Sequence, residues 1–218
     1  MHDFSEIVLA TGNPHKVAEL QPIFAAALGD AVRLVSLGQF EGLSEPVEDG
    51  GTIEANARIK ARGYAAQTGK PCLADDSGLV VDALGGAPGV DSSHYCTDGR
   101  ETGMDRPTRD AANNAKLLGA LESVSAADRT ARFLCVMALA VPGVDEIVAE
   151  ARGAFEGRIG ERPRVPAGDQ GFGYDPLFLV GPDYSQTGAE LAPEEKNRIS
   201  HRALAGAAMA TRLRDLVG

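Results

Sequence analysis

The chain has 218 residues, a length that suits one domain or two lobes that share a sheet. Hydrophobic residues make up 44% of it and charged residues 24%, which favours a folded core over a disordered chain. The net charge of −10 argues against binding of long nucleic acid, which requires a basic surface. A single nucleotide held by a few lysines and a metal ion remains compatible with this charge.

Three cysteines, Cys72, Cys96 and Cys135, occur without a Cys-x-x-Cys pair, which is typical of reduced thiols in a cytosolic protein. The N-terminal residues lack the basic and apolar regions of a secretion signal. The most apolar run, 133–141, is far shorter than the ~18 residues that a membrane-spanning helix needs. We therefore expect a cytoplasmic protein that does not enter a membrane.

The first predicted elements are a buried strand, Ile7–Ala10, then a loop with glycine, then an amphipathic helix. Asn13 suits the N-cap of that helix, and Pro14 suits its first position. Free N–H groups and the positive end of the helix dipole make such a loop a natural phosphate site. Thr11, Asn13 and Lys16 add side-chain donors. An ordinary capped turn between a strand and a helix explains the same residues.

An acidic loop that contains glycine, 42–51, follows a second predicted strand and leads into a predicted helix, 52–67. Thr52, Asn56 and Lys60 recur every four residues, so they share one face of that helix. A polar stripe with an amide and an ammonium group suits a ligand cleft. It also suits a solvated helix surface.

Asp75 and Asp76 stand side by side between two short apolar runs, 72–74 and 79–81, which predict strands. Neighbouring strand residues point in opposite directions, so only one of the two carboxylates can face a given cleft. Burial of one ionised carboxylate beside another is costly unless a cation compensates, and a divalent metal ion is the simplest such cation. A hairpin turn accounts for the Asp, Ser and Gly residues equally well.

The second half of the chain alternates helix and strand patterns. A predicted helix, 108–121, carries an apolar face of Ala111, Ala115, Leu118 and Leu121. The run 132–141 is almost continuously apolar, which is typical of a central strand. A proline and glycine turn then predicts an antiparallel partner strand over 146–155.

Two aromatic residues flanked by glycines, Phe172 and Tyr174, precede a predicted strand, 177–180. Such a segment suits stacking of a nucleic acid base, and a packed aromatic corner is the alternative. Ser200 suits the N-cap of the last helix, whose first residues are His201 and Arg202. Because cations oppose the helix dipole at this end, their placement favours an anionic or hydrogen-bonding ligand.

Six motifs occur in an order that closely resembles the inosine triphosphate pyrophosphatase family, the noncanonical purine nucleoside triphosphate pyrophosphatases. They are Thr11-Gly12-Asn13-Pro14-His15-Lys16, Asn56-Ala57 with Lys60-Ala61, Ala74-Asp75-Asp76-Ser77-Gly78-Leu79, Gly85-Gly86-Ala87-Pro88-Gly89, Phe172-Gly173-Tyr174-Asp175-Pro176 and Ser200-His201-Arg202. The resemblance runs from Ile7 to about Arg202. Six ordered blocks are far more specific than any one of them.

The resemblance implies an α/β fold for the whole chain, 1–218, with a long mixed β-sheet flanked by helices. A nucleotide-binding cleft would lie between two lobes, and the protein would be a homodimer. The implied reaction is Mg²⁺-dependent hydrolysis of ITP, dITP, XTP or dXTP to the monophosphate and pyrophosphate, which cleanses the nucleotide pool.

Carried over by motif, Asp76 would be the catalytic base and a metal ligand, with Glu48 as the second metal ligand. The substrate-binding residues would be Thr11, Gly12, Asn13, Pro14, His15, Lys16, Asn56, Lys60, Ser77, Phe172, Gly173, Tyr174, Asp175, Lys196, His201 and Arg202. One departure concerns His94, which stands where the family commonly has an arginine, so that arginine's role is not carried over. We interpret His94 as a surface histidine.

Two alternatives stay open at this point. One is a nucleotide pyrophosphatase with another base preference, and the other is a purine-nucleotide sensor that does not cleave its ligand. The acidic and basic set argues against the sensor, because a sensor does not need a base beside the metal.

Overall fold

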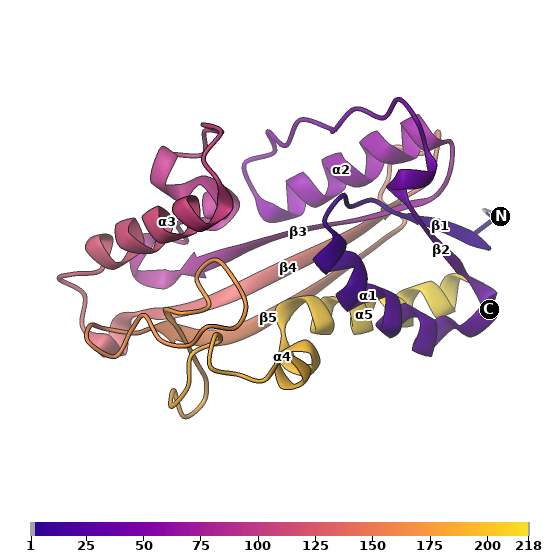
Figure 1. Ribbon diagram of the computed structural model, residues 1–218. Coiled ribbons are helices and arrows are strands. Elements are labelled where there is room, and N and C mark those ends of the chain that lie inside the picture. Colours follow the sequence, from indigo (N-terminus) through magenta and orange to yellow (C-terminus); the bar gives the residue numbers. More distant parts are fainter. Residues whose placement is uncertain (1–2, 218) are drawn as a thin grey trace. The chain divides into compact units, whose positions relative to one another are not determined.

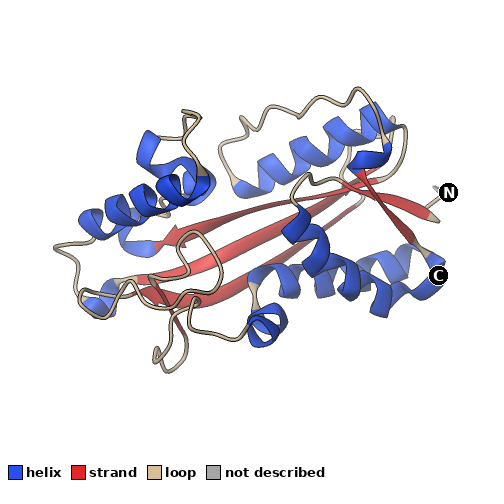
Figure 2. Ribbon diagram, in the orientation of Figure 1, coloured by secondary structure: helices blue, strands red, loops and turns tan. Residues whose placement is uncertain are grey.

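The computed structural model describes residues 3–217, without the side chains of Pro14, His15 and Asp30. It is a mixed α/β structure with a six-stranded sheet in the order β2-β1-β3-β4-β5-β6, flanked by helices (Figures 1 and 2). The predicted mixed sheet is therefore confirmed. The chain divides into two compact units: unit 1 is formed by the described parts of 1–77, 135–154 and 201–218, and unit 2 by 78–134 and 155–200.

Most predicted elements are present, with ends that differ by a few residues. The strands are β1 (Glu6–Leu9), β2 (Arg33–Ser36), β3 (Cys72–Val81), β4 (Thr130–Ala140), β5 (Ala149–Ile159) and β6 (Phe178–Val180). The helices are α1 (Pro14–Leu28), α2 (Ile53–Thr68), α3 (Arg106–Ala120), α4 (Pro193–Ile199) and α5 (His201–Val217), with a 3-10 segment, η4 (Gly89–Thr97). None of the helices in the described part of the chain has the length and hydrophobicity needed to cross a membrane.

The hairpin turn considered for Asp75–Gly78 is wrong, because β3 is one uninterrupted strand from Cys72 to Val81. Gly78 marks a close approach of the backbone instead of a turn. A Cβ at this position would lie only 2.3 Å from the carbonyl oxygen of Gly89. Polar residues therefore continue through the middle of a strand, and Asp75 and Asp76 point to opposite sides of it.

In unit 1, β1 pairs in parallel with both β2 and β3. The helices α1 and α5 lie side by side against one face of these strands (Figure 1), where Ile7, Leu9 and Leu73 pack with Phe24 and Met209. Alternate strand residues point the other way, toward α2, whose last residue, Thr68, contacts Cys72 through its hydroxyl at 3.3 Å. The site residues of unit 1 are thus held between two packed layers.

In unit 2, β6 pairs antiparallel with β5, and α3 packs beside η4. The predicted inward face of α3 is wrong in part, because Ala111 and Ala115 are exposed while Leu117 and Asn113 are buried. The amide of Asn113 accepts a hydrogen bond from the Cys96 backbone N–H at 2.7 Å and donates to backbone carbonyls of η4. These bonds satisfy a buried polar group and set the rotation of the helix.

Candidate active site

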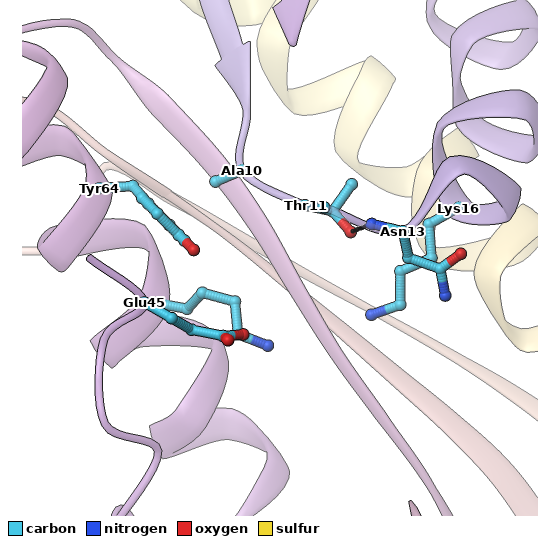
Figure 3. Close-up of a pocket in the computed structure, with 8 residues that line it drawn as sticks. Ala10, Thr11, Asn13, Lys16, Glu45 and Tyr64 are labelled. Atoms are coloured by element: carbon cyan, nitrogen blue, oxygen red, sulfur yellow. Dashed lines mark hydrogen bonds between the residues drawn. The ribbon is translucent and has the colours of Figure 1, made fainter. Parts of the chain in front are cut away.

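A cavity of about 420 Å³ lies in unit 1 beside the loop between β1 and α1 (Figure 3). Its lining residues are Ala10, Thr11, Gly12, Asn13, Lys16, Glu45, Lys60 and Tyr64. The Thr11 Oγ1 atom accepts a hydrogen bond from the Asn13 N–H at 3.1 Å, and the Asn13 carbonyl accepts one from Val17. The predicted strand, loop and helix are therefore found, and they place backbone donors beside this cavity. The predicted side-chain contacts of Pro14 and His15 lie outside the described residues.

Asp75 is a buried carboxylate, 3% exposed, that is surrounded by positive charge within unit 1. The Lys16 Nζ atom lies 2.8 Å from its Oδ2 atom, and the Nε atom of Arg202 lies 3.6 Å from the same oxygen. Burial by itself raises the pKa of Asp75, but the charges of Lys16 and Arg202 outweigh it and lower the pKa to about 2. Asp75 is therefore an ionised counter-charge at neutral pH.

Asp76 points away from Asp75, and its pKa is raised, whereas that of Asp75 is lowered. Its side chain is 15% exposed, and burial raises its pKa to about 6. The Lys60 Nζ atom, 3.9 Å from the Oδ1 atom of Asp76, opposes this rise, and the carboxylate of Glu48 adds to it. A carboxylate with a pKa near neutral is suited to accept a proton at physiological pH, which Asp75 is not.

The ammonium group of Lys60 compensates only part of the combined negative charge of Glu48 and Asp76. Both form ion pairs with the same ammonium group, since the Lys60 Nζ atom is also 2.9 Å from the Oε2 atom of Glu48. Mg²⁺ prefers hard oxygen ligands and keeps part of its shell for water and substrate oxygens, so two carboxylates fit it. Across residues 3–217 no group of three or more His, Cys, Asp and Glu side chains is placed to hold a metal ion.

Two other predicted substrate contacts are engaged within unit 1. Asn56 is buried, and its Oδ1 atom accepts a hydrogen bond from the Gly50 N–H at 2.9 Å, which anchors the acidic loop that carries Glu48. The Ser77 hydroxyl lies 3.4 Å from Asp75. Asn56 does not line the cavity of Figure 3, whereas Lys60, one helical turn later, does.

The glycine-flanked aromatic pair in unit 2 has one exposed and one buried ring. Phe172 is 42% exposed, which suits a stacking surface, whereas Tyr174 is 4% exposed and its hydroxyl donates to the Ser92 carbonyl at 2.8 Å. The packed aromatic corner is therefore found for Tyr174, and stacking of a base on Phe172 stays a prediction. Asp175 is buried, accepts the Phe172 N–H at 2.8 Å and pairs with Lys196.

Sequence reasoning missed three residues of α3 that hold the Phe172 turn. The Arg106 guanidinium lies over the Phe172 ring, 4.4 Å from its centre. The Gly173 N–H donates to the Asp110 carboxylate, and the Gly173 carbonyl accepts from Asn114, each at 3.0 Å. Arg106, Asp110 and Asn114 are spaced by four residues, so a polar stripe on one helix face was the available signal.

His201 and Arg202, at the start of α5, belong to unit 1. Arg202 is 5% exposed, and its Nη1 atom donates to Glu19 at 2.6 Å while its Nε atom faces Asp75. Gly153 of β5 allows this helix to pack closely, because a Cβ there would lie 2.2 Å from the His201 carbonyl oxygen. The sequence did not indicate a role for Glu19, because Glu19 and Arg202 are 183 residues apart in the chain.

His94, interpreted as a surface histidine, lies in unit 2 with its side chain 22% exposed. Its Nε2 atom is 2.8 Å from the Glu101 carboxylate, and the Ser93 hydroxyl contacts its Nδ1 atom. The Nη1 atom of Arg109 also lies 3.2 Å from the Nε2 atom of His94, and none of these three neighbours belongs to a predicted site motif.

The fold and the site define an α/β protein in which a loop at a helix N-terminus and two lysines line a cavity. Beside them lie two adjacent carboxylates, one with a lowered and one with a raised pKa. These groups are suited to an enzyme that acts on phosphate compounds. The sequence model of the Ham1 family matches residues 7–212, and the chain belongs to this family.

Similar proteins cover nearly the whole chain. A dITP/XTP pyrophosphatase of Pseudomonas aeruginosa is 48% identical over 213 residues, which are 98% of this chain and 99% of that protein. A dITP/XTP pyrophosphatase of Geobacillus kaustophilus is 46% identical over 213 residues, 98% of this chain and 96% of the relative. The solved structure of a HAM1 protein from Coxiella burnetii has a TM-score of 0.82 at 42% identity and covers 96% of this chain and 98% of its own. The resemblance inferred from the six motifs is confirmed.

Proposed function

We propose that this protein is a hydrolase of nucleotide metabolism that cleaves noncanonical purine nucleoside triphosphates, with ITP, dITP, XTP and dXTP as substrates. The products would be the monophosphate and pyrophosphate. The single observation that carries the chemistry is the placement of two adjacent carboxylates beside two lysines of one cavity. Asp75 lies 2.8 Å from Lys16, whereas Asp76 shares Lys60 with Glu48. This placement lowers the pKa of Asp75, and burial raises that of Asp76 to about 6. The names of the similar pyrophosphatases support the choice of substrate.

The triphosphate would bind along the loop Thr11–Lys16. The N–H groups at the start of α1 and the Lys16 ammonium supply donors and positive charge to phosphate oxygens. Lys16 is already held by Asp75 at 2.8 Å, so little side-chain entropy is lost when the ligand arrives. Gly12 leaves the loop backbone open, because among the described residues no atom beyond its chain neighbours lies within 4 Å of a Cβ built there.

Asp76 would take the proton of the attacking water, because its pKa lies near neutral while that of Asp75 does not. Mg²⁺, held by Glu48 and Asp76, would neutralise negative charge on the phosphate oxygens. Lys60, within ion-pair distance of both carboxylates, would keep them in place and add charge to the same region.

The base would stack on the exposed Phe172 ring, with Gly173, Tyr174, Asp175 and Lys196 shaping its surroundings. Hypoxanthine and xanthine present a 6-carbonyl and an N1–H donor, whereas adenine presents the inverted pattern. We propose that His201 and Arg202 donate to the 6-carbonyl, which predicts good turnover of ITP, dITP and XTP, poor turnover of GTP and very poor turnover of ATP.

The position of Arg202 beside Asp75 offers a second role for it, namely phosphate binding in unit 1. The two roles predict different kinetics. His201→Ala or Arg202→Ala should lower kcat/KM for ITP much more than for ATP if these residues read the base. Equal losses for both nucleotides would assign them to phosphate.

The test of the function is a panel of purine and pyrimidine triphosphates incubated with purified protein and Mg²⁺, with pyrophosphate release as the readout. A preference for canonical or pyrimidine triphosphates would favour the pyrophosphatase of other base preference. Tight binding of ITP without pyrophosphate release would favour the sensor.

We also propose a homodimer in the cytoplasm. The three cysteines form no disulfide with one another, which suits a reducing compartment. Sedimentation equilibrium distinguishes a dimer from the 22.7 kDa monomer.

A further inference from the structure

Tyr64 lies on the wall of the 420 Å³ cavity, although it belongs to none of the six motifs. It follows Lys60 by four residues on α2, so the two side chains project from the same face of the helix. Figure 3 shows Tyr64 and Glu45 across the cavity from Asn13 and Lys16. The Tyr64 side chain therefore faces the loop at which the triphosphate is proposed to bind.

The Tyr64 ring is buried and its hydroxyl is directed into the cavity (Figure 3). Thr68 bonds to the backbone carbonyl of Tyr64, but no described residue forms a hydrogen bond with its hydroxyl. A phenol on a ring fixed by packing is a preorganised donor, because few rotamers are lost when it binds a ligand. A polar group that is held in this way and faces a cavity is suited to ligand recognition.

The neighbouring charges indicate what this donor would meet. Burial and the carboxylate of Glu45 raise the pKa of Tyr64, so the phenol keeps its proton at neutral pH and can donate it to an acceptor. Thr11, Lys16 and Lys60 add further donors to the same lining. Glu45 is an anion in the same lining, so it opposes a bare phosphate and favours one whose charge is reduced by a divalent cation.

We propose that the Tyr64 hydroxyl is a further substrate-binding group, which donates a hydrogen bond to an oxygen of the Mg²⁺-complexed polyphosphate chain. This inference rests on the proposed function for the identity of the ligand. Pyrophosphate, the expected product, carries the same oxygens without the base, so its binding tests the inference directly.

The experiment compares wild type with Tyr64→Phe, which removes one oxygen and keeps the ring. Binding of inorganic pyrophosphate in the presence of Mg²⁺ is measured by isothermal titration calorimetry, and KM and kcat are measured for ITP. A hydrogen bond to a charged acceptor predicts about tenfold weaker pyrophosphate binding and about a tenfold higher KM, with kcat within about threefold. The matched control is Tyr184→Phe, a phenol of unit 2 that packs against Arg158 and is expected to change neither value.

Pyrophosphate affinity of Tyr64→Phe within about twofold of wild type overturns the inference, as does wild-type protein that binds no pyrophosphate. A purely structural role would lower the melting temperature without ligand and leave the affinity of the folded fraction unchanged, which also overturns it. If wild type binds pyrophosphate through Tyr64 but releases none from ITP, the proposed function fails while this inference stands.

Discussion

The raised pKa of Asp76 predicts that Asp76→Asn stabilises the metal-free protein at neutral pH. The pKa rises from 3.8 to about 6, mainly because burial disfavours the charged carboxylate, whose side chain is only 15% exposed. A difference of about 2.2 pKa units at 1.36 kcal/mol each corresponds to about 3 kcal/mol. Asparagine has nearly the same shape and no charge to bury, so it avoids this cost.

The sign of the pH dependence follows from linkage. Because the folded pKa of Asp76 lies above the unfolded one, its favourable contribution is present below pH 3.8 and is lost as pH rises through 6. The advantage of Asp76→Asn in free energy of unfolding should therefore grow from less than about 1 kcal/mol at pH 4 to about 3 kcal/mol at pH 8. Urea denaturation in EDTA, followed by circular dichroism at these pH values, measures it.

Asp75→Asn is the matched control, because it makes the same chemical change one residue away with the opposite expected sign. The pKa of Asp75 falls from 3.8 to about 2, so its contribution is present above pH 3.8 and is lost as pH falls toward 2. Asp75→Asn should cost about 2 kcal/mol at pH 7. An Asp76→Asn variant that is no more stable relative to wild type at pH 8 than at pH 4 would refute the reasoning.

Three further predictions concern catalysis and binding. Asp76→Asn should lower ITP turnover by ~10²-fold or more, and nearly normal turnover together with an inactive Asp75→Asn would reverse their roles. A chelator should abolish pyrophosphate release and added Mg²⁺ or Mn²⁺ should restore it, so full activity in EDTA would exclude the proposed metal ligands. Arg106→Ala should raise KM for ITP by roughly threefold through loss of the cation–π contact with Phe172, and an unchanged KM would show that the ring needs no such support.

The sequence by itself determined the features that depend on neighbouring residues. The sequence predicts the start of α1 at Pro14, because the fixed backbone angle of proline acts within one helical turn. The opposite directions of Asp75 and Asp76 follow from the alternation of a strand. The order of the motifs also sufficed to indicate the family, which the comparisons confirm.

The tertiary structure decided which carboxylate is the buried counter-ion and which has a pKa near neutral. Asp75 receives Lys16 from α1 and Arg202 from α5, whereas Asp76 receives Lys60 together with the like charge of Glu48. These partners come from segments far apart in the chain. The residues next to Asp75 and Asp76 in the sequence therefore do not indicate which of the two carboxylates these lysine and arginine side chains will face.

The tertiary structure also decided the continuous course of β3 and the residues that support Phe172. Asp, Ser and Gly favour turns locally, but the close approach of Gly89 to Gly78 requires a glycine inside a strand. The polar stripe of α3 is present in the sequence, but only the packing of α3 beside the Phe172 turn reveals what the stripe supports, as the contact with Arg106 shows. Caps and alternation are set by covalent neighbours, whereas charge pairing, burial and close approach depend on which distant segments meet.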